Sequence, residues 1–216
     1  MSAELISLFT ATFVTFFVLI DALGVAPIFA TLTAQGGPAY RRKMAFKATV
    51  VASLIMFAFA FGGAWLLGAM HISIDAFRAA GGVLLFLIAL DMVFEKRTER
   101  REHRASELME GHDDTEEPDD ISVFPIGIPM IAGPGSIATA MFYMSGAGGW
   151  TEKAVVLAAI GLNLVITLGI FLIAGPLVRM MGASVAGALT RILGVILAAL
   201  SVQLLIDGIK GAFGLA

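Results

Sequence analysis

The chain has 216 residues, of which 58% are apolar and only 14% charged, and its mean hydropathy is +0.91. These values exclude an ordinary soluble domain, in which about a quarter of the residues are charged. The sequence contains no cysteine, which excludes disulfides, thiolate metal sites and thiol–disulfide relays. We therefore expect an integral membrane protein.

Six apolar segments follow one another along the chain, and each is long enough to cross a bilayer. They cover residues 4–33, 44–70, 74–94, 122–146, 153–178 and 185–209. The first is too long for a signal peptide and has no basic region before it, so we expect it to be retained as a span. The sequence predicts an all-α membrane protein with six transmembrane helices.

Two of these segments contain residues that interrupt helices. The first holds Asp21, Gly24 and Pro27 well inside its apolar run. A charge costs several kcal/mol at membrane depth, and proline removes a backbone donor. The fourth holds three prolines and three glycines within residues 125–135. We expect the first and fourth helices to be broken, and two broken helices at corresponding places point to a transporter site.

The connection between the third and fourth segments differs from the rest of the chain. It is polar, lacks aromatic residues and carries 11 of the 17 acidic residues, so we expect it to be mobile. His103 and His112 lie in it beside acidic residues, but their spacing fits no ligand pattern and no metal site is predicted. The predicted divisions are a first three-helix repeat (1–94), a mobile cytoplasmic loop (95–121) and a second repeat (122–216).

Internal repetition relates the two halves. Three landmarks of the first half recur about 113 residues later. They are the interruption itself, the pair Arg78 and Gly81 (later Arg191 and Gly194), and Asp91 (later Asp207). Because each half has three spans, the second half enters the membrane from the opposite side. The sequence thus predicts a 3+3 inverted repeat, with close helix packing at Gly81, Gly82 and Gly194.

The basic residues favour one orientation. If the N-terminus and C-terminus both lie outside, 11 of the 14 basic residues fall on the inner side, as the positive-inside rule requires. These are Arg41, Arg42, Lys43, Lys47, Lys96, Arg97, Arg100, Arg101, Arg104, Arg179 and Arg191. We expect a multi-pass protein of the bacterial cytoplasmic membrane with both termini outside.

Four stretches together resemble the MarC-related (UPF0056) inner-membrane proteins of bacteria and archaea. The first is Asp-x-x-Gly-x-x-Pro-x-Phe-x-x-Leu-Thr, and the others are residues 77–89, 128–139 and 205–208. Ala22 stands where the family usually has proline, so we expect the first interruption to rest on Gly24 and Pro27. The resemblance covers nearly the whole chain and implies transport of small solutes, in particular alanine- or glycine-like amino acids.

The best candidate for a binding element is Gly133-Pro134-Gly135-Ser136. Pro134 is expected to end one helix and Ser136 to cap the next. The free N–H groups of a helix beginning there would suit a carboxylate. A proline kink made for packing is the alternative.

Asp21 has three interpretations: it ligates a substrate amine, carries a coupling proton, or caps the half-helix that follows it. Arg78 and Arg191 either reach toward the nearer membrane surface or form gating pairs, and Asp75 can pair with Arg78. Asn163 and Thr167 serve interhelical hydrogen bonding or substrate contact.

These features predict a secondary transporter of small solutes, with H⁺ or Na⁺ as the coupling ion and no other cofactor. The predicted substrate-binding residues are Asp21, Gly24, Pro27, Gly133, Pro134, Gly135, Ser136, Thr139 and Asn163, and the coupling or gating candidates are Asp21, Arg78 and Arg191.

A small-solute channel or an exporter without ion coupling is the closer alternative, since broken helices also build selectivity filters. An intramembrane protease is remote, because the histidines lie in or beside connections and no zinc motif exists. We expect no enzymatic activity and no nucleic-acid partner; the expected partners are a small-molecule substrate and the lipid bilayer.

Overall fold

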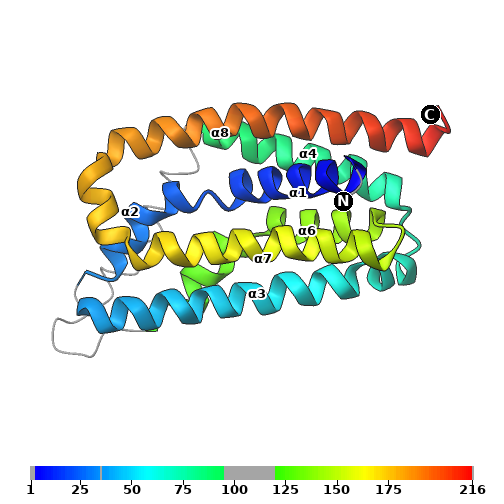
Figure 1. Cartoon of the computed structure of the whole chain (residues 1–216). Coiled ribbons are helices and arrows are strands. Elements are labelled where there is room, and N and C mark those ends of the chain that lie inside the picture. Colours follow the sequence, from blue (N-terminus) through cyan, green and yellow to red (C-terminus); the bar gives the residue numbers. More distant parts are fainter. Residues whose placement is uncertain (1–2, 35, 95–119, 216) are drawn as a thin grey trace.

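The computed structural model describes residues 3–34, 36–94 and 120–215, and those residues are helical apart from short connections (Figure 1). The elements in chain order are α1 (Ala3–Ile20), α2 (Ala22–Leu32), α3 (Gly37–Ala69), α4 (Ile74–Val93), η1 (Ser122–Ile131), α6 (Pro134–Gly146), α7 (Trp150–Leu172) and α8 (Ala174–Phe213). Most of the predicted 95–121 loop, with His103 and His112, lies outside the described residues.

Among the described residues, five helical stretches are long and apolar enough to cross a membrane, and there are six if the bent pair of η1 and α6 is one span. The five are Ala3–Leu32, Gly37–Ala69, Ile74–Val93, Trp150–Leu172 and Val185–Phe213. The protein is therefore an all-helical, multi-pass membrane protein, as the composition predicts.

The fifth span ends earlier than predicted. We expected it to reach residue 178, but α7 ends at Leu172 and α8 begins at Ala174. Pro176 lies in the first turn of α8, where proline is tolerated because the first N–H groups of a helix have no intrahelical partner. Figure 1 shows the chain turning at this point before it runs back as the long part of α8.

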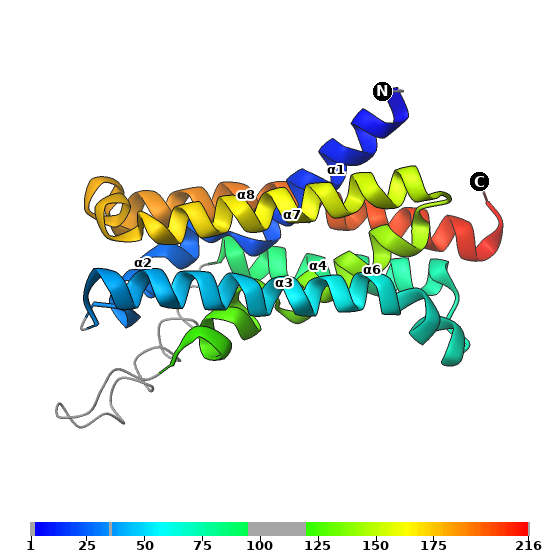
Figure 2. The ribbon, with the colours of Figure 1, turned by 60° about the horizontal axis from the view of Figure 1, so that its bottom comes forward.

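The two ends of the bundle carry different elements. Figure 1 shows the start of α3 and the turn into α8 at one end, and both chain termini at the other. In Figure 2 the first turns of α1 lean away from the bundle. The basic group Arg41, Arg42 and Lys43, near the start of α3, thus lies at the end opposite the termini.

The interrupted first segment is the most enclosed part of the fold. In its most apolar stretch 61% of the residues are buried, against 22–39% in the other four candidate spans. Phe29 of α2 stacks on Phe171 of α7 with ring centroids 4.4 Å apart. The other spans surround α1 and α2 and turn their exposed apolar side chains to the lipid.

The closest helix packing joins α4 to α8. A Cβ added at Gly82 would lie 2.8 Å from the Ser201 carbonyl oxygen, and one added at Gly194 would lie 3.2 Å from the carbonyl oxygen of Ala89. Such small residues let two backbones approach. The packing role predicted for Gly82 and Gly194 is confirmed. It is wrong for Gly81, where an added Cβ meets nothing within 4 Å, because one residue along a helix turns the side chain by about 100°.

Candidate functional site

The first helix is interrupted at Asp21 itself. Asp21 has φ 52° and ψ 51°, the left-handed region, between the end of α1 and the start of α2. Aspartate tolerates this conformation better than most residues because its short polar side chain bonds locally. Gly24 and Pro27 lie inside α2, so the expectation that they make the interruption is wrong. One left-handed residue separates α1 from α2, but the two helices still form one candidate span, Ala3–Leu32.

The Asp21 carboxylate is buried, with 1% of the residue exposed. The Gly24 N–H donates to its Oδ1 at 3.2 Å, and the Thr190 hydroxyl lies 3.3 and 3.2 Å from its two oxygens. A Cβ on Gly24 would come within 2.5 Å of the Thr190 hydroxyl, so only glycine leaves room for this contact. Asp21 thus caps α2 and ties it to α8; amine ligation and proton transfer stay predictions.

Thr190 is absent from the residues that the sequence predicted for the site. Thr190 and Arg191 are the polar residues of the apolar stretch 185–200, and polar residues inside a span are functional candidates. That signal could have found Thr190, although nothing in the sequence pairs it with Asp21.

The second interruption has a different form. The η1 segment carries i to i−5 hydrogen bonds, such as Ala132 N–H to the Gly127 carbonyl at 2.9 Å, and ends before α6 with a bend of 57°. The segment is not a regular helix, because Phe124 and Ile128 have extended φ and ψ angles; each of them precedes a cis proline. Gly133, in an extended conformation, is the N-cap of α6, and no side chain among the described residues supplies the cap.

Ser136 is therefore not the N-cap, contrary to the prediction. It lies in the first turn of α6, and its hydroxyl donates back to the Ile131 carbonyl at 2.9 Å. Pro134 takes the first helical position, which suits its fixed φ and missing N–H. The Ser136 hydroxyl thus satisfies a carbonyl at the end of η1 and does not cap α6.

The side chain of Leu19, close to the first interruption, reaches the backbone of the second. A Cβ added at Gly135 would lie 2.5 Å from Ile88 Cδ1 and 3.3 Å from Leu19 Cδ1, and Leu19 precedes Asp21 by two residues. Side chains of α1 and α4 therefore cover the backbone of Gly135. A solute that reaches this backbone has to displace Leu19 and Ile88.

Two buried hydroxyls near this contact lack a hydrogen bond. Thr139 on α6 and Thr12 on α1 are 3% and 0% exposed, and neither Oγ1 has a partner among the described residues. An unpaired buried hydroxyl costs about 1–3 kcal/mol. Close by, the Thr15 and Tyr143 hydroxyls share a bond of 3.0 Å. The sequence predicted Thr139 and missed the other three, which sit singly in apolar helices.

Asn163 joins α7 to α1. Its Nδ2 donates to the Phe13 carbonyl at 3.1 Å and to the Ala159 carbonyl at 2.9 Å. Thr167 donates to the Asn163 carbonyl within its own helix. Interhelical bonding is thus confirmed for Asn163 and wrong for Thr167, while contact of either with substrate stays a prediction.

The structure keeps the two candidate arginines apart. Arg78 Nη1 lies 3.7 Å from Asp75 Oδ1, which confirms that predicted pair, and its guanidinium sits 5.2 Å from the Phe142 ring centroid. Because Gly208 packs on Ala79 and Gly194 on Met92, Arg78 and Arg191 lie at opposite ends of the α4–α8 pair. They do not form one gate together.

Comparison with known proteins gives matches over nearly the whole chain. Residues 6–213 match the family described as MarC family integral membrane protein. The UPF0056 membrane protein MJ1677 of Methanocaldococcus jannaschii is 39% identical over 205 residues, covering 94% of this chain and 97% of that protein.

Bacterial relatives match as well. The UPF0056 membrane protein YvbG of Bacillus subtilis is 34% identical over 93% of both chains. YhcE of Escherichia coli is 30% identical over 93% of this chain and 91% of its own. No solved structure matches.

Proposed function

We propose that this chain, which belongs to the MarC family of integral membrane proteins, is a secondary transporter of neutral amino acids the size of alanine or glycine. One observation carries the proposal: the Asp21 carboxylate and the Gly135 backbone in the uncapped first turn of α6 are both buried, and Leu19 links the two places. A zwitterion that leaves water needs a group for its cation and a group for its anion, and these two can serve.

The carboxylate of the substrate would bind at the start of α6. The first-turn N–H groups and the positive end of the helix dipole favour an anion there. The unpaired Thr139 hydroxyl, one turn further along the same helix, gains a partner when a polar solute enters. Asp21 would take the substrate amine or the coupling H⁺; Na⁺ is the other coupling ion that its charge allows.

An inverted 3+3 repeat would make the two interruptions equivalent. The N-caps Asp21 and Gly133 are 112 residues apart, as are Gly82 and Gly194. Gly82 packs on Ser201 and Gly194 packs on Ala89, and these two partners are again 112 residues apart. Reciprocal contacts of this kind are what a two-fold axis produces. These contacts support a transporter in which the broken first and fourth helices form one site that opens alternately to the two sides of the membrane.

The orientation proposed for this repeat has both termini outside and the basic end of the bundle in the cytoplasm, following the positive-inside rule. Cysteines introduced singly at Ser2 and Thr115 of this cysteine-free chain test it. A membrane-impermeant thiol reagent should label position 2 in intact cells. Labelling of position 115 from outside would overturn the orientation.

Counterflow of labelled alanine and glycine into liposomes tests the function. The purified protein should accelerate uptake, and Asp21→Asn should abolish either exchange or ion-driven accumulation. Lost exchange assigns the amine to Asp21; retained exchange with lost accumulation assigns the coupling proton. Asp207→Asn, at a partly exposed carboxylate bonded to Gln203, is the matched control and should behave as wild type. If Asp21→Asn transports as wild type does, the site lies elsewhere.

A further inference from the structure

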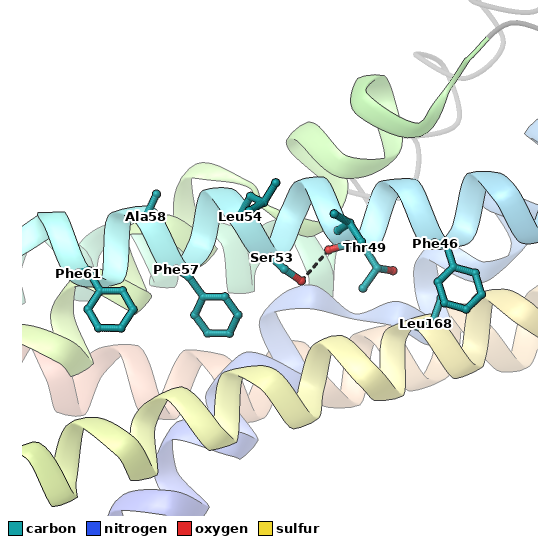
Figure 3. Close-up of a pocket in the computed structure, with 9 residues that line it drawn as sticks. Phe46, Thr49, Ser53, Leu54, Phe57, Ala58, Phe61 and Leu168 are labelled. Carbon is teal, nitrogen blue, oxygen red and sulfur yellow. Dashed lines mark hydrogen bonds between the residues drawn. The ribbon is translucent and has the colours of Figure 1, made fainter.

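A groove runs along α3 where this helix lies beside α7, and its volume is about 370 Å³. Figure 3 shows the rings of Phe46, Phe57 and Phe61 projecting from α3 on the side of α7, which contributes Leu168. Thr49 and Ser53, between these rings, form its floor. The groove is thus a row of large apolar side chains over small ones.

Neither hydroxyl of the groove has a free proton to donate to a polar ligand. The Thr49 hydroxyl donates to the Ala45 carbonyl at 2.9 Å, and the Ser53 hydroxyl donates to the Thr49 carbonyl at 2.7 Å (Figure 3). Both hydroxyls are therefore satisfied within α3. The surface left for a ligand is hydrocarbon and aromatic, which suits an alkyl chain and excludes an amino acid.

One end of the groove is strongly basic. Arg42 and Lys43 precede Phe46 by four and three residues, so they share its face of the helix, and both are exposed. Lys47 is paired with Asp120, and Arg41 donates to the Thr33 hydroxyl at 3.2 Å. Arg42 and Lys43 also lie near the positive N-terminal end of α3, where cations are unfavourable and an anion is stabilising.

We propose that this groove binds an anionic glycerophospholipid, with one acyl chain along α3 and the phosphate at Arg42 and Lys43. Eleven residues separate Phe46 from Phe57, a rise of roughly 16 Å, which matches the ~15 Å of one leaflet. Basic pockets between helices bind anionic headgroups in this way. A second copy of the chain fits the groove less well, because parallel neighbours packed there would bring their basic ends together.

Native mass spectrometry of the detergent-purified protein tests this lipid site. With matched dioleoyl lipids, phosphatidylglycerol should bind in preference to phosphatidylcholine. The double variant Arg42→Gln with Lys43→Gln should weaken phosphatidylglycerol binding roughly tenfold or more. Arg179→Gln, an exposed basic residue of α8 at the same end of the bundle, is the matched control and should bind like wild type.

A second variant tests whether the groove holds the acyl chain of the lipid. Ala58 lines the groove and is exposed, so Ala58→Phe should fill the space and lower phosphatidylglycerol binding without unfolding the protein. Equal binding of the two lipids, or an equal loss in Arg179→Gln, would overturn the proposal. So would a wild-type dimer that Ala58→Phe converts to a monomer, since a second copy would then occupy the groove.

Discussion

The two interruptions begin their helices in opposite ways: α2 starts at a buried residue, whereas α6 starts at the exposed Pro134, followed by buried Gly135 and Ser136. At the first, the Asp21 carboxylate accepts hydrogen bonds from the Gly24 N–H and from the Thr190 hydroxyl. At the second, Gly133 brings no side chain, and Ser136 turns its hydroxyl back to Ile131. One helix start is therefore occupied by a carboxylate of the chain, and the other has no side-chain cap.

Because of this difference, the two helix starts favour groups of opposite charge. A buried carboxylate attracts a cation or holds a proton, whereas an uncapped helix N-terminus attracts an anion. The Asp21 carboxylate and the first-turn residues Gly135 and Ser136 are buried, and interactions there are stronger than in water. Under the proposed function, these two helix starts recognise the two ends of a zwitterion.

The largest expected effect comes from Gly24→Ala. The new Cβ would lie 2.3 Å from Asp21 Oδ2 and 2.5 Å from the Thr190 hydroxyl, so the cap and its link to α8 must separate. We expect the free energy of unfolding to fall by about 3 kcal/mol and transport to be lost, as measured by thermal unfolding in detergent and by counterflow.

Gly161→Ala is the control for this change, because an added Cβ there meets nothing within 4 Å. It should be neutral or slightly stabilising, since alanine favours helix by about 1 kcal/mol over glycine. Equal melting temperatures for the two variants would show that Asp21 and Thr190 can separate without cost.

Two neighbouring glycines test the packing of α4 against α8, on which the proposed inverted repeat rests. Gly82→Ala drives a Cβ to 2.7 Å from the Leu205 backbone nitrogen, whereas Gly81→Ala meets open space. The first should lower the free energy of unfolding by about 2 kcal/mol, and the second should raise it slightly. If both variants are equally stable by chemical denaturation, α4 and α8 do not pack through Gly82.

Much of the fold follows from sequence because long apolar runs have few solutions in a bilayer. The runs predicted the candidate spans, and glycines at Gly82 and Gly194 predicted the α4–α8 contact. The site was harder to predict from the sequence, because its contacts join distant segments. Nothing local pairs Thr190 with Asp21, 169 residues away, and nothing local shows that Leu19 covers Gly135.

Local rules also misplaced two details at the interruptions. Serine is a common N-cap, yet Pro134 at the first helical position makes Gly133 the cap and leaves Ser136 inside α6. Glycine and proline are the usual breakers, yet Asp21 alone adopts the left-handed conformation that ends α1. In both cases the competing rule was present in the sequence, and only tertiary contacts decided between them.

The same substitution at the two interruptions should have opposite effects on stability. Thr190→Val removes a hydroxyl that bonds to a buried carboxylate, which should cost about 1.5 kcal/mol. Thr139→Val removes a buried hydroxyl without a partner among the described residues, so the protein should be equally or slightly more stable. Thermal unfolding measures both changes.

A measurement of substrate binding then distinguishes the roles of these two threonines. If Thr139 contacts the solute, Thr139→Val should weaken alanine binding while the fold is unharmed. A Thr139→Val protein that melts lower than wild type would contradict the unpaired state of this hydroxyl. Unchanged alanine binding would remove Thr139 from the site.

The smallest effect concerns Asp120, the exposed acid that precedes the second interruption, in contrast to buried Asp21 at the first. Lys47 donates to Asp120 at 2.5 Å, and the Ser122 side chain and N–H also donate to it, so the pKa of Asp120 is lowered from 3.8 to about 2. Because the pKa is lower in the folded protein, the stabilisation is present above about pH 4 and is lost as the pH falls toward 2.

Lys47 and Asp120 are each about half exposed, so solvent screening limits this stabilisation to a few tenths of a kcal/mol. Asp120→Asn should lower the melting temperature slightly at pH 7, and the difference from wild type should shrink near pH 2 and in high salt. A large drop at neutral pH would instead mean that the start of η1 depends on Asp120 as strongly as α2 depends on Asp21. The contrast between a buried and an exposed acid would then fail.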